Sequence, residues 1–218
     1  MNGLFCAKLN RRNILKTGDD PLMQLFHYHY WTPFVEETEK AYTSLGFEVK
    51  GRFAKEGSFP PPQTWDDFRE KKPSFRIIEM RKGQINITFG YSKKVLFDHI
   101  GFLVTDDEYD QLLVQAQKRN WAIQTGERRT FLSTPMRLRL ELQRRTDVIE
   151  TGEEAIAEMT IAVPDLTHTP TVDQLLDGLT QPIHWKKGER LSLLEVKMID
   201  SHGMNTTDPN GVHVLTQG

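Results

Sequence analysis

The sequence has very little cysteine and no long apolar run. Cys6 is the single cysteine, so no disulfide can form within the chain, which is typical of a protein from a reducing compartment. No apolar stretch approaches the roughly 20 residues that a membrane-spanning helix needs. The first residues lack the order of a secretory signal, because Arg11 and Arg12 follow the apolar stretch instead of preceding it. We therefore expect a cytoplasmic protein without a membrane partner, in which residues 1–22 form a flexible extension.

An excess of charge of one sign is also absent. The 28 lysine and arginine residues nearly balance the 30 aspartate and glutamate residues, and no long basic run occurs. A chain without a basic patch gives no reason to expect nucleic acid as a partner. Apolar residues make up 38% of the chain and charged residues 27%, which is the composition of a folded globular protein.

Three segments share one pattern, in which an apolar run is followed by an amphipathic helix that begins near a threonine. The helices are expected to begin at Thr32, Thr105 and Thr171, which stand 73 and 66 residues apart (105 − 32 and 171 − 105). Glu108 and Gln174 stand three residues after the second and third threonine, which is the spacing of a capping box. The stripe of the first helix that faces the core is expected to contain Phe34, Thr38, Ala41 and Leu45.

Strand-like runs of alternating polarity follow each helix. The first two units read as one strand, one helix and three strands, and the third unit is shorter. We therefore predict an α+β fold with two βαβββ modules, residues 23–93 and 97–146. A polar linker at 147–153 and a partial third module of βαβ type at 154–218 are expected to follow.

A long connection, residues 51–74, interrupts the first module. It contains three consecutive prolines and a short helical segment that Thr64 could cap. Connections of this length are usually functional or mobile. Two interpretations remain open: a surface excursion or dimer contact, and a lid that carries Trp65 and Phe68 over a pocket.

Histidines alternate with tyrosines along the first predicted strand. Side chains of a strand alternate between its two faces, so His27 and His29 share one face. His99 holds a similar place in the second module, because it stands six residues before Thr105 and His27 stands five before Thr32 (105 − 99 and 32 − 27). Pseudo-two-fold symmetry between the modules would bring these two imidazoles together.

Charged side chains alternate with leucines in the last strand of the second module. One face is expected to carry Arg137, Arg139, Glu141 and Gln143. Such a face is either solvated or lines a polar cavity. Glu141 could add a carboxylate to the two equivalent histidines, and two histidines with one carboxylate form the facial triad of non-haem iron enzymes. A purely structural role for the histidines is the alternative, since no local metal-binding motif is present.

At this point the residues resemble a known family. The segment 27–47, HYHYWTPFVEETEKAYTSLGF, is similar to the opening of the vicinal-oxygen-chelate superfamily, which contains glyoxalases, bleomycin resistance proteins and extradiol dioxygenases. The segment 97–112, FDHIGFLVTDDEYDQL, resembles the same opening in the second module of that family. The segment 208–217, DPNGVHVLTQ, resembles its closing strand. The resemblance covers residues 23–146 well and 154–218 in part.

The resemblance implies paired modules that curl into a half-barrel of mixed strands, with helices on the outer face and a metal inside. Ligands in the family come from the first and last strands of each module. Carried over by position, they are His27, His99 and Glu141, with an unfilled place near Asn86 or Thr88. Two histidines and one glutamate in this order resemble the extradiol dioxygenases, which implies Fe²⁺ or Mn²⁺, with Zn²⁺ or Ni²⁺ as alternatives.

Two further side chains are candidates for catalysis. His29 would lie beside the metal as an acid or base, or form part of the wall, and it could also replace His27 as the ligand. Arg139, together with Gln143, could bind an anionic substrate or orient Glu141. A solvated or paired arginine is the alternative for Arg139. The remaining arginines near the site are expected to be solvated: Arg128 and Arg129.

The third unit lacks the ligand pattern. Ala157 or Met159 falls near the first ligand position and Leu215 near the last, so His213 is expected to be structural. The other histidines are expected in loops: His168, His184 and His202. This unit could extend the sheet, cover the cavity, or pair with its copy in a homodimer.

Two functions from different classes follow from the resemblance. The first is a metalloenzyme, a dioxygenase, lyase or isomerase, that binds a small oxygenated substrate through the metal. The second is a metal-free module that binds small molecules, like the drug-sequestering resistance proteins of the same superfamily. The second is motivated by aromatic side chains near the expected pocket and lid: Trp31, Trp65 and Phe68.

Overall fold

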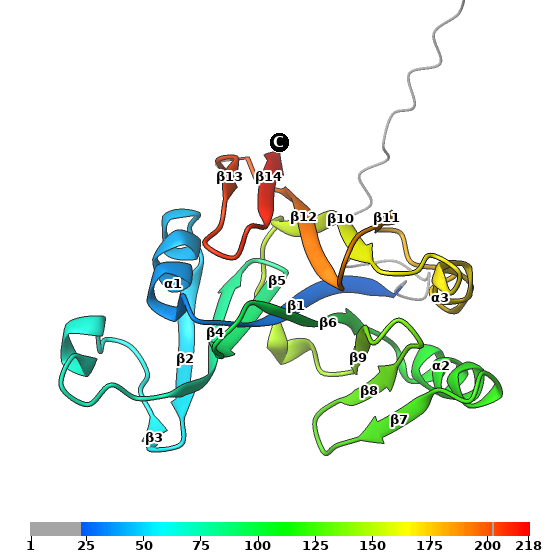
Figure 1. Cartoon of the computed structure of the whole chain (residues 1–218), viewed down its shortest axis with the longest axis horizontal. Helices are drawn as coiled ribbons and strands as arrows, with labels where there is room; N and C mark the ends of the chain where they lie inside the picture. Colours follow the sequence, from blue (N-terminus) through cyan, green and yellow to red (C-terminus); the bar gives the residue numbers. More distant parts are fainter. Residues whose placement is uncertain (1–22, 202) are drawn as a thin grey trace, which may run out of the picture.

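The computed structural model describes residues 23–201 and 203–218, which form two mixed β-sheets and three α-helices (Figure 1). The predicted extension, residues 1–22, and His202 lie outside the described residues. Within the described part, no helix is long and apolar enough to cross a membrane. The predicted α+β fold class is confirmed.

The first sheet contains both predicted modules. The first module has one additional short strand: β1 (Gln24–Thr32), α1 (Val35–Ser44), β2 (Glu48–Ala54), β3 (Gly57–Ser58), β4 (Phe75–Lys82) and β5 (Ile85–Tyr91). The second module follows the predicted order: β6 (Leu96–Leu103), α2 (Asp106–Lys118), β7 (Ala122–Thr125), β8 (Thr130–Ser133) and β9 (Arg139–Gln143). The strand order is β3-β2-β4-β5-β1-β6-β9-β8-β7, so β1 and β6 lie at the centre of a curled sheet that does not close into a barrel.

The second sheet has five strands and is built on the same plan. Its elements are β10 (Ala155–Val163), α3 (Thr169–Leu175), β11 (Ile183–Lys187), β12 (Ser192–Ile199), β13 (Thr206–Thr207) and β14 (His213–Gln217). β10 pairs antiparallel with β12, and the parallel neighbours of these two strands are β11 and β14. The first sheet has the same arrangement, in which β1 and β6 are antiparallel and β5 and β9 are their parallel neighbours.

The strand registers align the two sheets residue by residue. In the β1–β6 pair and in the β10–β12 pair, three residue pairs lie between two register shifts. By this alignment, Glu158 takes the place of His27 and Glu195 takes the place of His99. The prediction that Ala157 stands near the first ligand position, with Met159 as the alternative, is therefore wrong by one residue.

The second sheet consequently repeats the architecture without the predicted ligands. Leu215 pairs with Lys197 in the same way as Glu141 pairs with Gly101, so it takes the place of the last-strand ligand, as expected. His184 lies in β11, and its prediction as a loop residue is wrong. This strand was not foreseen because it is a short, largely exposed edge strand that shows no clean alternation of polarity.

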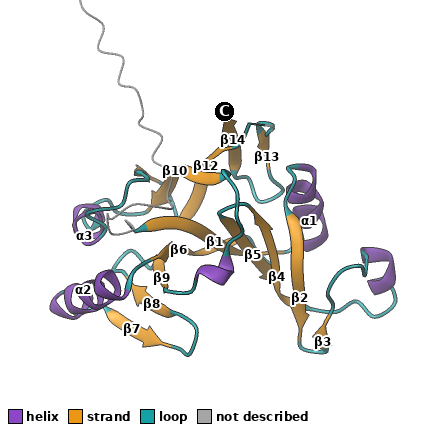
Figure 2. Cartoon of the chain, turned by 180° about the vertical axis from the view of Figure 1, so that it is seen from behind, coloured by secondary structure: helices purple, strands orange, loops and turns teal. Residues whose placement is uncertain are grey.

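Helices and the second sheet together cover the outer face of the first sheet (Figure 2). Tyr28 and Tyr30 point from β1 to this face, and the hydroxyl of Tyr28 donates to that of Tyr42 on α1 at 2.9 Å. The hydroxyls of Tyr30 and Tyr42 both donate to the Asp208 carboxylate in the turn before β14, at 2.7 and 3.2 Å. The opposite face of β1 is left free to carry histidines.

Of the four predicted helix caps, Thr105 is correct for α2 and Thr64 for the short 3₁₀ helix at Trp65–Phe68, whereas those of α1 and α3 are wrong. Thr105 and Glu108 form the predicted capping box of α2. α1 begins at Val35 because Thr32 still belongs to β1, where its hydroxyl accepts a bond from the Phe34 amide at 3.0 Å. The predicted core stripe is correct in part: Thr38 and Leu45 are buried, whereas Phe34 is exposed. The other buried residues of α1 are Val35, Glu39 and Tyr42.

The third helix begins two residues earlier than predicted. α3 starts at Thr169 after His168, and no side chain caps it. The predicted capping box of Thr171 and Gln174 is absent, because Pro170 is compatible with the first turn of a helix and allows the earlier start. In the last strand of the second module, Arg137 lies outside β9 with a φ of 65°, so it belongs to a turn and not to the charged face.

The long connection packs on itself. Trp65 and Phe68 lie in the short 3₁₀ helix η1 (Trp65–Phe68) and make edge-to-face contacts with Phe75 at 5.4 Å between ring centroids. A buried ion pair anchors the segment, since Arg52 donates to both carboxylate oxygens of Glu39 at 2.7 and 2.6 Å. Trp65 donates to the same carboxylate at 3.0 Å.

Candidate metal centre

The register of the first sheet makes His27 and His99 symmetry equivalents. His27 pairs with Gly101 and His29 pairs with His99, on either side of the pair formed by Tyr28 and Ile100. A pseudo-two-fold axis through that central pair exchanges His27 with His99 and His29 with Gly101. The predicted equivalence of the two histidines therefore follows from the observed strand pairing.

The same symmetry identifies the unfilled fourth position. His27 pairs with Asn86 on β5, and His99 pairs with Arg139 on β9. Two residues further along these strands, Thr88 is therefore the equivalent of Glu141. The hydroxyl of Thr88 lies 3.4 Å from His27 Nε2, so a neutral hydroxyl occupies the place where a second carboxylate would stand.

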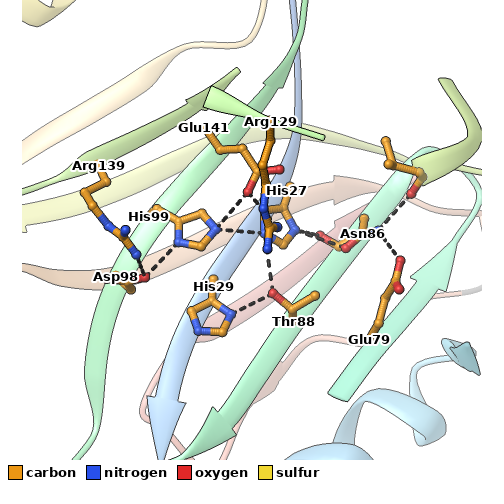
Figure 3. Close-up of polar contacts among 11 residues, drawn as sticks. His27, His29, Glu79, Asn86, Thr88, Asp98, His99, Arg129, Arg139 and Glu141 are labelled. Atoms are coloured by element: carbon orange, nitrogen blue, oxygen red, sulfur yellow. Dashed lines mark hydrogen bonds and ion pairs between the residues drawn. The ribbon is translucent and has the colours of Figure 1, made fainter. Parts of the chain in front are cut away.

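Three predicted ligands come together at the centre of the sheet (Figure 3). One ligand atom from each of His27, His99 and Glu141 lies within 4.8 Å of the others. His99 Nε2 is 3.2 Å from His27 Nε2 and 3.2 Å from Glu141 Oε2. All three side chains are buried. Two imidazole nitrogens and one carboxylate oxygen fit a divalent transition metal with open coordination positions.

The ring of His27 is held from behind by Asn86. His27 Nδ1 lies 2.9 Å from the Asn86 carbonyl oxygen and 3.1 Å from its side-chain oxygen. The Asn86 amide in turn donates to Glu79 and to the carbonyl of Val148, which lies in the 3₁₀ helix η2 (Thr146–Val148), at 2.8 Å each. Because acceptors surround Nδ1, this nitrogen carries the proton and Nε2 keeps its lone pair for a ligand.

The ring of His99 is held in the same way by Asp98. His99 Nδ1 lies 2.9 Å from Asp98 Oδ2, and Arg139 forms an ion pair with the same oxygen. The Arg139 guanidinium also lies 4.5 Å from the ring centre of Phe131, which contacts His99 edge-on. Arg139 therefore contacts Asp98 and Phe131, which both contact His99, and it is not among the residues that line the cavity.

Burial and neighbouring charges set the protonation states that a metal needs. Burial lowers the pKa of His27 to about 4, so its imidazole is neutral at neutral pH. Burial would raise the pKa of Glu141, but the hydrogen bond with His99 and the electrostatic influence of the neighbouring histidines and Arg129 lower it to about 2. A neutral imidazole and an ionised carboxylate are the forms that bind metals.

His29 lies beside the three ligands and not among them. Its ring stacks on His99 with centroids 4.9 Å apart, and its Nδ1 lies 2.6 Å from the Thr88 hydroxyl. Trp31 packs edge-on against the other side at 4.9 Å. Burial lowers the pKa of His29 well below its usual value. The structure thus groups His27, and not His29, with His99 and Glu141.

A glycine makes room for the His27 ring. A Cβ atom at Gly101 would lie 2.9 Å from His27 Cβ and 3.1 Å from His27 Cδ2. Any side chain at this position would push the imidazole away from the ligand cluster. The predictions from the sequence did not single out Gly101, Asp98 or Asn86 as a support for the ligands, although Asp98 directly precedes His99.

A cavity of about 320 Å³ opens onto two of the three candidate ligands, His27 and Glu141. His27, Glu141 and Gln143 line its polar floor. Its apolar wall is formed by Phe26, Phe53 and Ile77, and its basic residues are Arg81, Arg128, Arg129 and Arg145. Nothing from residues 57–74 lines this cavity, so the interpretation of Trp65 and Phe68 as its lid is wrong.

Comparison by sequence gives no relative, since neither a family model nor a curated protein matches the chain. Comparison by structure gives many. The 2,3-dioxygenase LapB from Pseudomonas sp. KL28 superposes with a TM-score of 0.64 at 12% identity, over 89% of this chain and 92% of that one. The 2,2′,3-trihydroxybiphenyl 1,2-dioxygenase from Sphingomonas wittichii strain RW1 gives 0.61 at 11% identity, over 90% and 91%.

A third solved structure agrees with these two. The homoprotocatechuate 2,3-dioxygenase from Arthrobacter globiformis gives a TM-score of 0.59 at 10% identity, over 90% of this chain and 80% of that one. Identities this low establish a common fold and not a common activity. The chain therefore shares its fold with these dioxygenases, in agreement with the fold that the resemblance in the sequence implies.

Proposed function

We propose that this protein is a metal-dependent oxygenase of the extradiol dioxygenase type, which acts on a small aromatic substrate with two adjacent hydroxyl groups. The buried cluster of His27, His99 and Glu141, two of which line the cavity, carries this proposal. The dioxygenases named above share the fold, which supports the choice of reaction class. A bound Fe²⁺ or Mn²⁺ would supply open coordination positions and redox chemistry.

The side chains of this chain would then have separate tasks. His27, His99 and Glu141 hold the ion, and Asn86 and Asp98 fix the two imidazole orientations. The apolar wall of the cavity positions the aromatic ring and excludes water from it.

His29 is the candidate acid or base. It is neutral at neutral pH because burial lowers its pKa, and its Nδ1 is already bonded to Thr88. Its Nε2 has no hydrogen-bond partner among the described residues. This nitrogen could accept a proton from the hydroxyl of a substrate bound at the ion, although His29, like Arg139, does not itself line the cavity. Arg139 is a positioning residue in this proposal, because its contacts reach the ligands only through Asp98 and Phe131.

The alternative of a metal-free binding module has lost part of its motivation. Trp65 and Phe68 pack against Phe59 and Phe75 and are remote from the cavity lining. Of the three aromatic residues that favoured this alternative, Trp31 alone lies near the cluster, where it supports the ring of His29.

Elemental analysis and oxygen uptake test the proposal together. Protein purified without a histidine tag would be loaded anaerobically with Fe²⁺ or Mn²⁺, desalted, and mixed with a panel of catechols in an oxygen electrode. We expect about one ion per chain in the wild type, loss of that ion in His99→Ala, and catechol-dependent oxygen uptake in the wild type alone. Absence of a bound ion in the folded wild type would contradict the proposal.

A further inference from the structure

Arg129 forms an ion pair with the Glu141 oxygen that a bound metal ion would need. Arg129 Nη1 lies 3.1 Å from Glu141 Oε2, and this is the same oxygen that lies 3.2 Å from His99 Nε2 (Figure 3). Oε2 is thus the carboxylate atom that faces the ligand cluster. Arg129 was expected to be solvated, yet its guanidinium contacts a carboxylate whose side chain is only 3% exposed.

Arg129 reaches the cluster from the turn between β7 and β8. Arg129 follows β7 in a short turn, in which the Gly126 amide donates to the Arg129 carbonyl at 2.9 Å. Its guanidinium lies over the ring of Phe131 at 5.5 Å, and 39% of its side chain is exposed to solvent. It can therefore swing out without disturbing the core, whereas His27, His99 and Glu141 are fixed by central strands.

One negative charge faces two possible cations. Glu141 is the single carboxylate of the cluster, and its charge is balanced by Arg129 in this structure. A divalent ion bound to Oε2 would place a second cation a few ångströms from the guanidinium, where repulsion between like charges is strong. Both cations cannot keep close contact with the same oxygen.

We propose that Arg129 competes with the divalent ion for Glu141 Oε2. In this role it holds Glu141 in place and lowers the affinity of the site for the ion, because the ion must displace the guanidinium in order to bind. Entry of the ion displaces the guanidinium and with it the turn 126–129, of which Arg128 and Arg129 line the cavity. Metal occupancy and the shape of the cavity entrance are then coupled through one side chain. The inference rests on the proposed metal site and adds to it a residue that opposes loading.

Mn²⁺ titration of variants tests the competition. Arg129→Gln and Arg129→Met should bind Mn²⁺ about ten-fold more tightly than the wild type in isothermal titration calorimetry, because one unit charge is removed near the ion. Arg190→Gln removes the same charge from an exposed loop of the second sheet, at a residue that does not line the cavity and has no ion-pair partner among the described residues. It should change the affinity by less than about two-fold, because an exposed, more distant charge is screened by salt. Circular dichroism of each variant checks the fold.

The outcomes separate this inference from the proposed function. A wild type that binds one Mn²⁺ while both Arg129 variants bind it equally or more weakly would overturn the competition and leave the metal site intact. Absence of binding in the wild type and in both variants would overturn both. Binding in the Arg129 variants alone would support the competition strongly.

Hydrogen exchange provides a readout that is independent of affinity. Addition of Mn²⁺ to the wild type should accelerate hydrogen exchange in peptides that cover 126–130. The reason is that the hydrogen bond from the Gly126 amide to the Arg129 carbonyl weakens when the Arg129 side chain leaves Glu141. The His99→Ala variant should show no acceleration. Unchanged exchange in a wild type that has bound Mn²⁺ would overturn the displacement of the turn.

Discussion

Each imidazole of the cluster is oriented by an acceptor on its far side, and this pairing decides which nitrogen can bind a metal. For His99 the acceptor is Asp98, which directly precedes it in the sequence. Neighbours on one strand normally point to opposite faces, but a register shift lies between the pairs of His29 and Tyr30 with β6, next to this position. The irregularity allows two consecutive residues to meet.

Removal of the Asp98 carboxylate should therefore weaken metal binding without removing a ligand. We expect Asp98→Ala to lower Mn²⁺ affinity by about 10- to 100-fold, the usual effect of losing a group that orients a metal-binding histidine. Calorimetric titration measures the change. Asp110→Ala, on the exposed face of α2, is the control. Unchanged affinity in folded Asp98→Ala would show that the orientation of His99 does not depend on Asp98.

The buried histidines should make the stability of the protein depend on pH. The unfolded chain binds a proton at each histidine below about pH 6.5, whereas burial lowers the pKa of His27 to about 4 and that of His29 in the same direction. The free energy of unfolding should fall as the pH decreases from 6.5 towards 4, by about 2 kcal/mol between pH 7 and pH 5 from His27 alone, and His29 should add a loss in the same direction. Glu141, with its lowered pKa, loses its contribution only below about pH 4.5.

Urea titrations at these two pH values, in the presence of a chelator, measure this dependence. His27→Gln should reduce the difference between the two values, because the neutral amide cannot take up a proton. His184→Gln, at an exposed position of β11, should leave the difference unchanged. An equal free energy of unfolding for the wild type at pH 7 and pH 5 would contradict the predicted dependence.

At the scale of elements, periodicity predicted what depends on local sequence. Residues close together in the sequence determine the two modules, the alternation of side chains along β1 and the capping box of α2. The starts of α1 and α3 were missed because Thr32 continues the strand and Pro170 allows an earlier turn. β11 was missed because an edge strand is fixed by its neighbour, β10, and not by its own pattern.

The sequence predicted the site residues that occupy equivalent positions in the two modules. It did not predict contacts between residues that are distant in the sequence. His27 and His99 stand at like places in two repeats, so their equivalence could be seen in the sequence. The contact between Arg129 and Glu141 joins two strands through a turn, and no pattern of the sequence reports which way that arginine points. The roles of His29 and Arg139 stay predictions.

The long connection of the first module should depend on its buried ion pair. Glu39→Ala would leave Arg52 buried beside Trp65 without a carboxylate, and removal of one partner of a buried pair usually costs about 3–5 kcal/mol. Both side chains are less than one-tenth exposed. The free energy of unfolding from urea titration, followed by tryptophan fluorescence, measures the loss.

The control for that substitution lies one turn earlier on the same helix. Glu36 pairs with Lys40 and Arg69, whose side chains are more than half exposed. Glu36→Ala should therefore cost less than about 1 kcal/mol. Similar losses in the two variants would show that burial of the pair with Arg52 is not what anchors the connection.

At the scale of the whole molecule, the second sheet supports the strand that carries the histidines. β10 and β12 lie against β1 and β6, and the side chains of β1 point alternately to the cavity and to this packed face. Lys82 on β4 reaches Asp200 after β12, and Tyr30 reaches Asp208 before β14. Residues 154–218 therefore support the first sheet behind the site. In the second sheet, the positions equivalent to the three ligands are held by Glu158, Glu195 and Leu215. The predicted homodimer stays a prediction.

Substitution of Asp208 should test whether contacts with the second sheet affect metal binding in the first sheet. Asp208→Ala leaves the hydroxyls of Tyr30 and Tyr42 without their acceptor and removes the oxygen that receives the Val212 amide. Unsatisfied buried groups cost about 1–3 kcal/mol each, so we expect a loss of about 3 kcal/mol or more in urea titration. Asp177→Ala, an exposed substitution after α3, is the control.

The same variant distinguishes a supporting sheet from an independent one. Tyr30 stands next to His29 on β1, so a shift of this strand would displace His27 relative to its partners across the sheet. We expect Asp208→Ala to weaken Mn²⁺ binding by several-fold as well as to destabilise the fold, since ligand geometry tolerates little displacement. Full Mn²⁺ affinity in a destabilised Asp208→Ala protein would mean that the first sheet alone holds the ligands. The second sheet would then contribute to the stability of the fold but not to the geometry of the metal ligands.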